Sequence, residues 1–344
     1  MMTNLTARLY RAWKQAVLAD KVINQFEAVQ DDSSGRWAKG DRIIYGVKYI
    51  DNQFAYYARN LNQNCNIQGA TEQKAVGDTG YLCRLNGYRA LRPGAGNSPL
   101  GRQPDIDAEA DLCRFHCQNS EHPISLLRRE PLLRVPLAHF TWNAYYNVAP
   151  LETEGHFLWI PTTAAGDIPH LLQRLTPPLI EDAVQLFGQL SDTILFFNAL
   201  HAGASVNHIH FQAVYHRQSL PIEVALTSDY KGYRLLNGYP AQAVVFGLSQ
   251  TTQLTGYVEK LQRLDIPFNL AMLSDRMIVV ARDGDRAIVP EFPGDGLAAL
   301  GMCGVIATVD RHAFETVDAA MIEAVFQKMV IPASKIIDSF AELS

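Results

Sequence analysis

The sequence predicts an α+β fold in which a mainly antiparallel sheet is flanked by helices. Short runs rich in β-branched and aromatic residues are joined by tight turns, as at Asp51 and Asn52 between the runs 42–50 and 53–58. A strand pair bounded by proline precedes a helix in the middle of the chain, and a weaker strand pattern of this kind follows later. The 344 residues, 48% of them hydrophobic, suffice for two domains or one large duplicated unit.

The elements follow from local periodicity. Apolar residues at helical spacing predict an amphipathic helix over 5–17 and a second helix over 179–190, with Thr176 as its N-cap and Pro177 at its first position. A C-terminal helical pattern breaks near Pro332. Residues 61–125 are rich in Asn, Gly, Pro and charge, and predict long loops with short elements. The remaining expected segments are strands at 140–148, 156–160, 193–198, 207–215, 241–246, 268–272 and 277–281 and a C-terminal helical tail over 317–343.

The run 207–215 carries the most chemistry, because polar and apolar residues alternate along it. Side chains two apart on a strand share a face, so His208, His210 and Gln212 are expected on one face and the apolar residues between them on the other. Neutral imidazole is a nucleophile at pH 7 and can form a phosphoramidate with phosphorus. The central residue, His210, is the expected nucleophile, and its neighbours are expected to stabilise the phosphoryl oxygens.

Two other interpretations of the histidine pair remain open. Two imidazoles on one strand face can hold a metal ion, and they can also form hydrogen bonds with a purely structural role. The small-residue turn 201–205 before the strand favours phosphoryl chemistry, because its backbone N–H groups and the Ser205 hydroxyl can approach an anion. An ordinary strand-to-strand turn is the alternative for this segment.

The His-x-His-x-Gln pattern after a small-residue turn resembles the transferase branch of the histidine-triad superfamily, which has Gln where the hydrolase branch has a third histidine. Within that branch the chain is most similar to GDP-hexose phosphorylases (GDP-L-galactose or GDP-D-glucose) and also similar to diadenosine tetraphosphate phosphorylases. The resemblance runs in order from about Asn143 to Arg282, and is faint in the first hundred and last sixty residues. The resembling segments are 147–150, 155–156, 160–161, 207–215, 220–223, 238–240 and 266–269.

The resemblance implies a duplicated histidine-triad-like unit with one active site. The division expected is 1–130 for an N-terminal helix, hairpin and long loops, 131–226 for the first half with the active site, and 227–344 for a second, degenerate half. It also implies phosphorolysis of a nucleoside-diphosphate hexose, in which a nucleotidyl-histidine forms on His210 and inorganic phosphate releases the nucleoside diphosphate. The expected phosphate- and nucleotide-binding residues are Gly203, Ser205, Asn198, Asn147 and, for the leaving group, His201.

A dinucleotide phosphorylase is the alternative within the same chemistry, and a non-catalytic nucleotide- or metal-binding protein is the alternative outside it. No cofactor is expected, and no metal at the catalytic histidines. The five cysteines are expected to be free thiols. Cys113, Cys117 and His122 form a candidate zinc set, although three residues separate the cysteines where two are usual.

The bulk composition constrains the partners. The net charge of −5 disfavours a nucleic-acid surface, and no apolar run of the length of a membrane helix is present. The first residues lack the apolar core of a signal peptide, so a cytoplasmic location is expected. The expected partners are a nucleotide sugar and inorganic phosphate, without nucleic acid or membrane, and a homodimer is the candidate assembly.

Overall fold

The computed structural model describes residues 4–28, 31, 35–91, 100–122, 124–292 and 296–340. Parts of two predicted segments lie outside the described residues, namely 92–99 and 123 in the expected loops and 341–343 in the expected C-terminal helix. The strands are β1 (Asn24–Glu27), β2 (Arg42–Ile50), β3 (Gln53–Asn60), β4 (Cys65–Asn66), β5 (Thr71–Val76), β6 (Tyr81–Asn86), β7 (Leu133–Pro136), β8 (Thr141–Tyr146), β9 (His156–Thr162), β10 (Thr193–Asn198), β11 (Phe211–Tyr215), β12 (Leu226–Tyr230), β13 (Tyr233–Asn237), β14 (Val244–Gly247), β15 (Phe268–Leu273), β16 (Arg276–Ala281) and β17 (Val305–Thr308). The helices are α1 (Leu5–Leu18), α2 (Pro177–Phe187), α3 (Pro221–Val224), α4 (Thr251–Arg263), α5 (Ala299–Met302), α6 (Arg311–Thr316), α7 (Ala319–Met329) and α8 (Ala333–Ser339), with short 3-10 turns η1 (Gly87–Leu91), η2 (Leu126–Arg128) and η3 (Gly284–Arg286).

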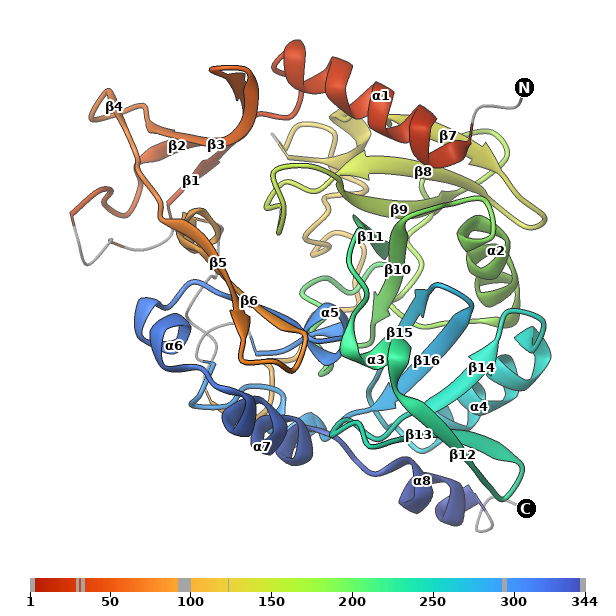
Figure 1. The fold of residues 1–344 in the computed structure, drawn as a ribbon. Helices are drawn as coiled ribbons and strands as arrows, with labels where there is room; N and C mark the ends of the chain where they lie inside the picture. Colours follow the sequence, from red (N-terminus) through yellow and green to blue (C-terminus); the bar gives the residue numbers. More distant parts are fainter. Residues whose placement is uncertain are drawn as a thin grey trace.

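A ten-stranded sheet forms the centre of the molecule, with the order β12-β13-β14-β16-β15-β10-β11-β9-β8-β7. Its pairings are antiparallel throughout, and helices flank it (Figure 1). The predicted α+β class with a mainly antiparallel sheet is therefore confirmed.

The two halves of this sheet repeat one connectivity. In the first half three strands, β7 to β9, precede α2, and the pair β10 and β11 follows; in the second half β12 to β14 precede α4, and β15 and β16 follow. In each half the last strand pairs with the third, and the halves meet where β10 pairs with β15. This shared order supports the predicted duplicated unit at the level of topology.

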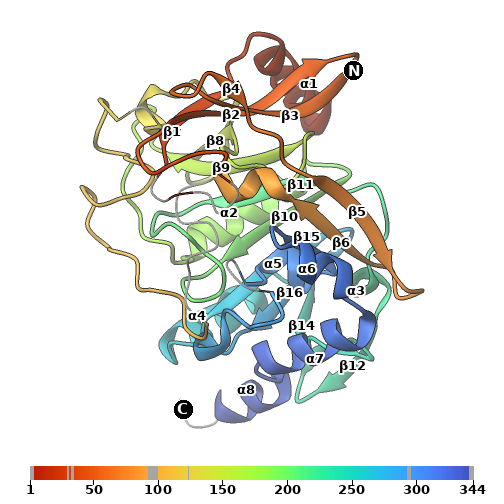
Figure 2. The same cartoon turned by 90° about the vertical axis from the view of Figure 1, so that its left-hand side faces the viewer.

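Different layers cover the two faces of the sheet, as Figures 1 and 2 show. Helices α1, α2, α4 and α8 pack on one face, where Phe211 and Ala213 of β11 are fully buried. The β5–β6 hairpin and α5, α6 and α7 pack on the other face, against Phe196 and Val214. Alternation along β11 therefore places His210 and Gln212 on the face toward the β5–β6 hairpin and α5.

Several local predictions are confirmed. Asp51 and Asn52 both have positive φ in the turn between β2 and β3, as a two-residue hairpin requires. Helix α2 begins at Pro177, although Thr176 makes no side-chain capping bond. The region 61–125, expected to contain long loops with short elements, includes the β5–β6 hairpin over 71–86, and β6 pairs in parallel with the distant strand β17. In the part of the chain that the structure describes, no helix has the length and apolar character needed to cross a membrane.

Candidate active site

His210 lies directly before β11, and the predicted strand over 207–215 is corrected to Phe211–Tyr215. The reason is the buried side chain of Gln173, which bonds the main chain of His210 in place of a neighbouring strand. Gln173 Oε1 accepts from the His210 N–H at 3.0 Å, and its Nε2 donates to the His210 carbonyl at 3.3 Å. The backbone around His210 is therefore held by one side chain, and the imidazole is 4% exposed.

A single hydrogen bond determines the tautomer of His210. Its Nδ1 lies 2.8 Å from the main-chain carbonyl oxygen of His208. A carbonyl oxygen only accepts, so Nδ1 carries the proton and Nε2 carries a free lone pair. Burial lowers the pKa of His210 to about 4, so the ring is neutral at pH 7. His210 thus has the protonation state that a nucleophile toward phosphorus needs.

Gln212 is oriented by a histidine from the neighbouring strand β9. His156 is buried, and its Nδ1 accepts from the N–H of Leu151 at 2.8 Å. Its Nε2 therefore carries the proton and donates to Gln212 Oε1 at 2.9 Å. Burial lowers the pKa of His156 to about 3 and keeps the ring neutral. With its oxygen bound to His156, the Gln212 carboxamide is left to donate through its amino group.

His208 belongs to a second cluster, which lies beside His210. Cys113, Cys117, His170 and His208 each offer one ligand atom, and these four atoms lie within 4.8 Å of one another. Cys113 Sγ is 3.6 Å from His208 Nδ1, and Cys117 Sγ is 3.4 Å from His170 Nδ1. Tetrahedral zinc with ordinary Zn–S and Zn–N bonds places sulfur and nitrogen about 3.6 Å apart. The four-donor cluster therefore has the composition and spacing of a closed structural zinc site.

The tautomer of His170 supports metal binding in this cluster. Its Nε2 lies 2.9 Å from the carbonyl oxygen of Ala108, which fixes the proton on Nε2 and leaves the Nδ1 lone pair facing Cys117. His122, expected in the zinc set, lies outside the cluster and stacks on His116 at 3.4 Å between ring centroids. Cys113 and Cys117 of the candidate set lie in the cluster, where their neighbours are His170 and His208.

This placement corrects the expectations for His208. The side chain was expected to face a bound phosphate beside His210. Instead the ring is fully buried against Cys113 and Phe115, because the segment 113–117 covers it. His208 still contacts His210, through the carbonyl oxygen that accepts from His210 Nδ1.

The turn 201–205 has the small residues that an anion site needs, but one of its donors is already engaged. Gly203 has φ +102°, and an added Cβ would lie 2.6 Å from the Ala298 Cβ, so only glycine fits. The Gly203 N–H donates to Gln103 Oε1 at 3.0 Å. Ser205 is exposed at the end of the turn, and His201 Nε2 lies 3.2 Å from Asp105. Residues 101–105 thus lie over the turn, and Gln103 contacts the amide expected to bind phosphate.

Asn147, which directly follows β8, and Asn198, which ends β10, lie near His156 and His210. Asn147 Nδ2 lies 3.2 Å from His156 Nε2, and its Oδ1 accepts from the N–H of Ala149. Asn198 ends β10, and Gln173 Nε2 donates to its carbonyl at 2.8 Å as well as to that of His210. Asn147 therefore contacts His156, and Asn198 shares the Gln173 amide with His210; the phosphate-binding role expected of both stays a prediction.

The N-terminal region contacts this site through residues that sequence reasoning missed. Arg89 Nη1 donates to the carbonyl of Ala149 at 2.6 Å, and its positive charge contributes to lowering the pKa of His156. Tyr56 Oη is 3.4 Å from the Pro150 carbonyl. The segment after Asn147 is thus in contact with β3 and η1 of the N-terminal region, where the resemblance is faint.

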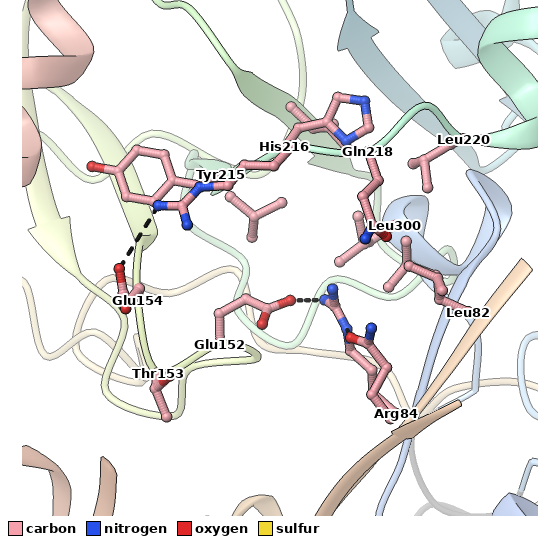
Figure 3. A pocket seen from close by; sticks show the side chains of 15 residues that line it. Leu82, Arg84, Glu152, Thr153, Glu154, Tyr215, His216, Gln218, Leu220 and Leu300 are labelled. Carbon is pink, nitrogen blue, oxygen red and sulfur yellow. Dashed lines mark hydrogen bonds and ion pairs between the residues drawn. The ribbon is translucent and has the colours of Figure 1, made fainter. Parts of the chain in front are cut away.

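A separate cavity of about 300 Å³ lies at the far end of β11, around Tyr215, His216 and Gln218 (Figure 3). Its two arginines face carboxylates: Arg84 pairs with Glu152, and Arg217 lies 3.8 Å from Glu154. Each of these cations therefore has a carboxylate beside it, which makes the cavity less favourable for a phosphate.

Comparisons with known proteins show what the chain resembles in sequence and in fold. No model of a known protein family matches the chain. GDP-L-galactose phosphorylase 1 of Arabidopsis thaliana is 33% identical over 142 residues, which are 38% of this chain and 31% of that protein. GDP-D-glucose phosphorylase 1 of Macaca fascicularis is 36% identical over 175 residues, which are 49% of this chain and 44% of that protein. These matches span less than half of each relative and confirm the predicted resemblance to GDP-hexose phosphorylases.

A solved structure shares the fold over most of both chains. Yeast Ap4A phosphorylase Apa2 in complex with Ap4A aligns with a TM-score of 0.52 and 16% sequence identity, over 77% of this chain and 90% of that chain. This likeness establishes a common α+β fold with antiparallel sheet.

Proposed function

We propose that this protein is a nucleotidyl phosphorylase acting on a nucleoside-diphosphate hexose, with GDP-hexose as the preferred substrate. The observation that carries the proposal is the hydrogen bond from His210 Nδ1 to the His208 carbonyl, which leaves a neutral Nε2 as nucleophile. The sequence similarity to GDP-hexose phosphorylases supplies the substrate class.

The reaction follows as two displacements at the α-phosphorus. His210 Nε2 attacks, the bond from the α-phosphorus to the bridging oxygen breaks, and hexose 1-phosphate leaves with that oxygen. An oxygen of inorganic phosphate then attacks the same phosphorus, the P–N bond breaks, and GDP leaves. The amino groups of Gln212 and Asn198 donate to the non-bridging oxygens, where negative charge accumulates in each transition state.

We also propose that Cys113, Cys117, His170 and His208 hold a structural zinc ion. The ion would fix the segment that carries His208 and thereby the carbonyl that orients His210. His208 then serves as ligand and main-chain acceptor, and Gln212 remains the side chain that contacts phosphate.

Steady-state kinetics test the covalent route. With the concentrations of GDP-hexose and inorganic phosphate both varied, we expect parallel lines in double-reciprocal plots, because the first product leaves before phosphate binds. A phosphate-dependent screen of nucleoside-diphosphate sugars and dinucleoside polyphosphates, with identified products, provides the substrates. Intersecting lines would contradict the two-step route, and absence of turnover across the screen would contradict the proposed function.

A second prediction concerns which base and which leaving group of the substrate the site prefers. We expect kcat/KM for GDP-hexose to exceed that for ADP-hexose and for diadenosine tetraphosphate at least tenfold, which corresponds to roughly 1.4 kcal/mol. A site that satisfies the guanine N–H and amino donors leaves its acceptors unpaired with adenine. The second candidate function is phosphorolysis of diadenosine tetraphosphate, favoured by the shared fold with the yeast enzyme. A preference for that substrate would establish the second candidate and leave His210 in its role.

A further inference from the structure

A buried arginine that pairs with no carboxylate in the described part of the chain lies behind the candidate active site. Arg282 follows β16 and is 0% exposed. Its Nε donates to the Met329 carbonyl at 3.2 Å, and its Nη1 donates to Asn269 Oδ1 at 2.6 Å and to the Leu297 carbonyl at 2.7 Å. Among the described residues, nothing accepts from its Nη2. A buried cation held only by neutral acceptors destabilises the fold relative to an apolar side chain, so a role beyond packing is indicated.

The arginine determines how two carboxamides are turned. Guanidinium only donates, so the oxygen of Asn269 faces Arg282 and its Nδ2 must face away. That Nδ2 donates to Asn198 Oδ1 at 2.9 Å and to the Ala202 carbonyl at 2.6 Å. Asn198 Oδ1 also accepts from the Ala299 N–H at 2.9 Å. The oxygen of Asn198 is thus fixed on the side of Asn269, and no described residue accepts from its amino group.

Asn198 lies opposite His210, the proposed nucleophile, in the register of the sheet. Phe196 pairs with Gln212 in the antiparallel register, so the position two residues further along β10 lies beside His210. Gln173 Nε2 confirms the proximity, since it donates to the carbonyls of both Asn198 and His210. Asn269 pairs with Asn198 across the junction of the two halves. Arg282 and Asn269 therefore connect the second half of the sheet to the catalytic residues of the first.

We propose that Asn269 and Arg282 are positioning residues that hold the amino group of Asn198 toward the phosphoryl group attacked by His210. This inference rests on the proposed function, which places a phosphoryl group there. The carboxamide torsion of asparagine is broad and nearly two-fold, so an unrestrained Asn198 would present its oxygen as readily as its nitrogen. An oxygen facing a phosphoryl oxygen repels it, whereas the amino group donates to it. The degenerate half of the fold thus serves the active site of the other half.

The decisive variant is Asn269→Asp. An ionised carboxylate only accepts, so Asn198 has to turn its amino group toward residue 269 and away from the substrate. The carboxylate also gives Arg282 a counter-ion, so the fold is expected to persist, as thermal unfolding would show. We expect kcat to fall roughly tenfold or more with a smaller change in KM, because the donor matters most in the transition state. The matched control is Asn237→Asp, at an exposed position on β13, which should leave kcat unchanged.

A double-mutant cycle separates positioning from a structural role. If Asn269 acts through Asn198, adding Asn269→Asp to Asn198→Ala should change kcat less than twofold, while each single change alone lowers it strongly. Independent, multiplying effects would overturn the inference. If Asn269→Asp fails to fold, Arg282→Gln repeats the cycle, because glutamine both donates and accepts and releases the orientation of Asn269.

A binding measurement keeps this inference separate from the proposed function. The same four proteins are titrated with GDP, whose phosphates present the same oxygens. Non-additive losses of affinity support the positioning role even if the wild-type chain does not turn over GDP-hexose, a result that would remove only the proposed function. Additive losses of GDP affinity would overturn the positioning role. A GDP affinity that neither substitution changes would also overturn it, whether or not the protein turns over GDP-hexose.

Discussion

His210→Asn should lower turnover of the preferred nucleotide sugar by several orders of magnitude. The substitution removes the Nε2 lone pair, and a covalent route is lost as a unit when its nucleophile is lost. Asparagine is smaller than the buried imidazole and keeps a hydrogen-bond donor for the His208 carbonyl, so the chain is expected to fold. Initial rates with saturating phosphate measure the effect.

The matched control for this variant is His139→Asn. His139 is exposed, and its Nε2 lies 2.8 Å from Glu181 on the surface, far along the sheet at the β7–β8 turn. Wild-type rates are expected there. If His210→Asn also retained wild-type rates in a folded protein, the nucleophile assignment would have to be abandoned.

The second large effect concerns the four-donor cluster. Replacing both cysteines, as Cys113→Ser with Cys117→Ser, should remove bound zinc and lower the unfolding temperature steeply. Structural zinc contributes apparent binding free energies on the order of 10 kcal/mol, comparable to the total stability of a domain. Turnover should fall as well, because His208 in the cluster carries the carbonyl that orients His210.

Elemental analysis of the purified chain checks this prediction, with about one zinc ion expected per wild-type chain. The control is Cys65→Ser, since Cys65 is exposed and lies outside the cluster. The zinc proposal would be contradicted if the wild-type protein contained no metal and a strong chelator changed neither its unfolding temperature nor its turnover. The original expectation of a site that works without metal would then stand.

Sequence patterns predicted the helices and strands whose formation depends on residues close together in the chain. Strand β10 was expected at its observed bounds, and the β2–β3 hairpin and helix α2 also formed as their turn and proline residues indicate. Each of these segments has its pattern within one short window. Local periodicity could not give the β5–β6 hairpin its parallel partner β17, because the pairing joins Leu82 to Val305.

The sequence indicates candidate site residues that are close together in the chain. It does not indicate residues that only the fold brings together from distant segments. His210 and Gln212 stand two residues apart, so alternation predicts that they share one face. The start of β11 was misplaced because the side chain of Gln173, distant in sequence, replaces ladder bonds at His210. His170 was missed because no spacing rule links it to Cys117, and its role becomes visible only when the fold brings the two within 3.4 Å.

The central claim is that His210 carries the nucleotide between the two half-reactions. Intact-mass and peptide-level mass spectrometry of the chain, quenched after mixing with GDP-hexose in the absence of phosphate, tests it most directly. We expect a guanylyl adduct on His210 that added phosphate removes with release of GDP. The adduct should be absent from the His210→Asn variant. Complete turnover of GDP-hexose by phosphate, with no adduct on His210 under any quench, would contradict it.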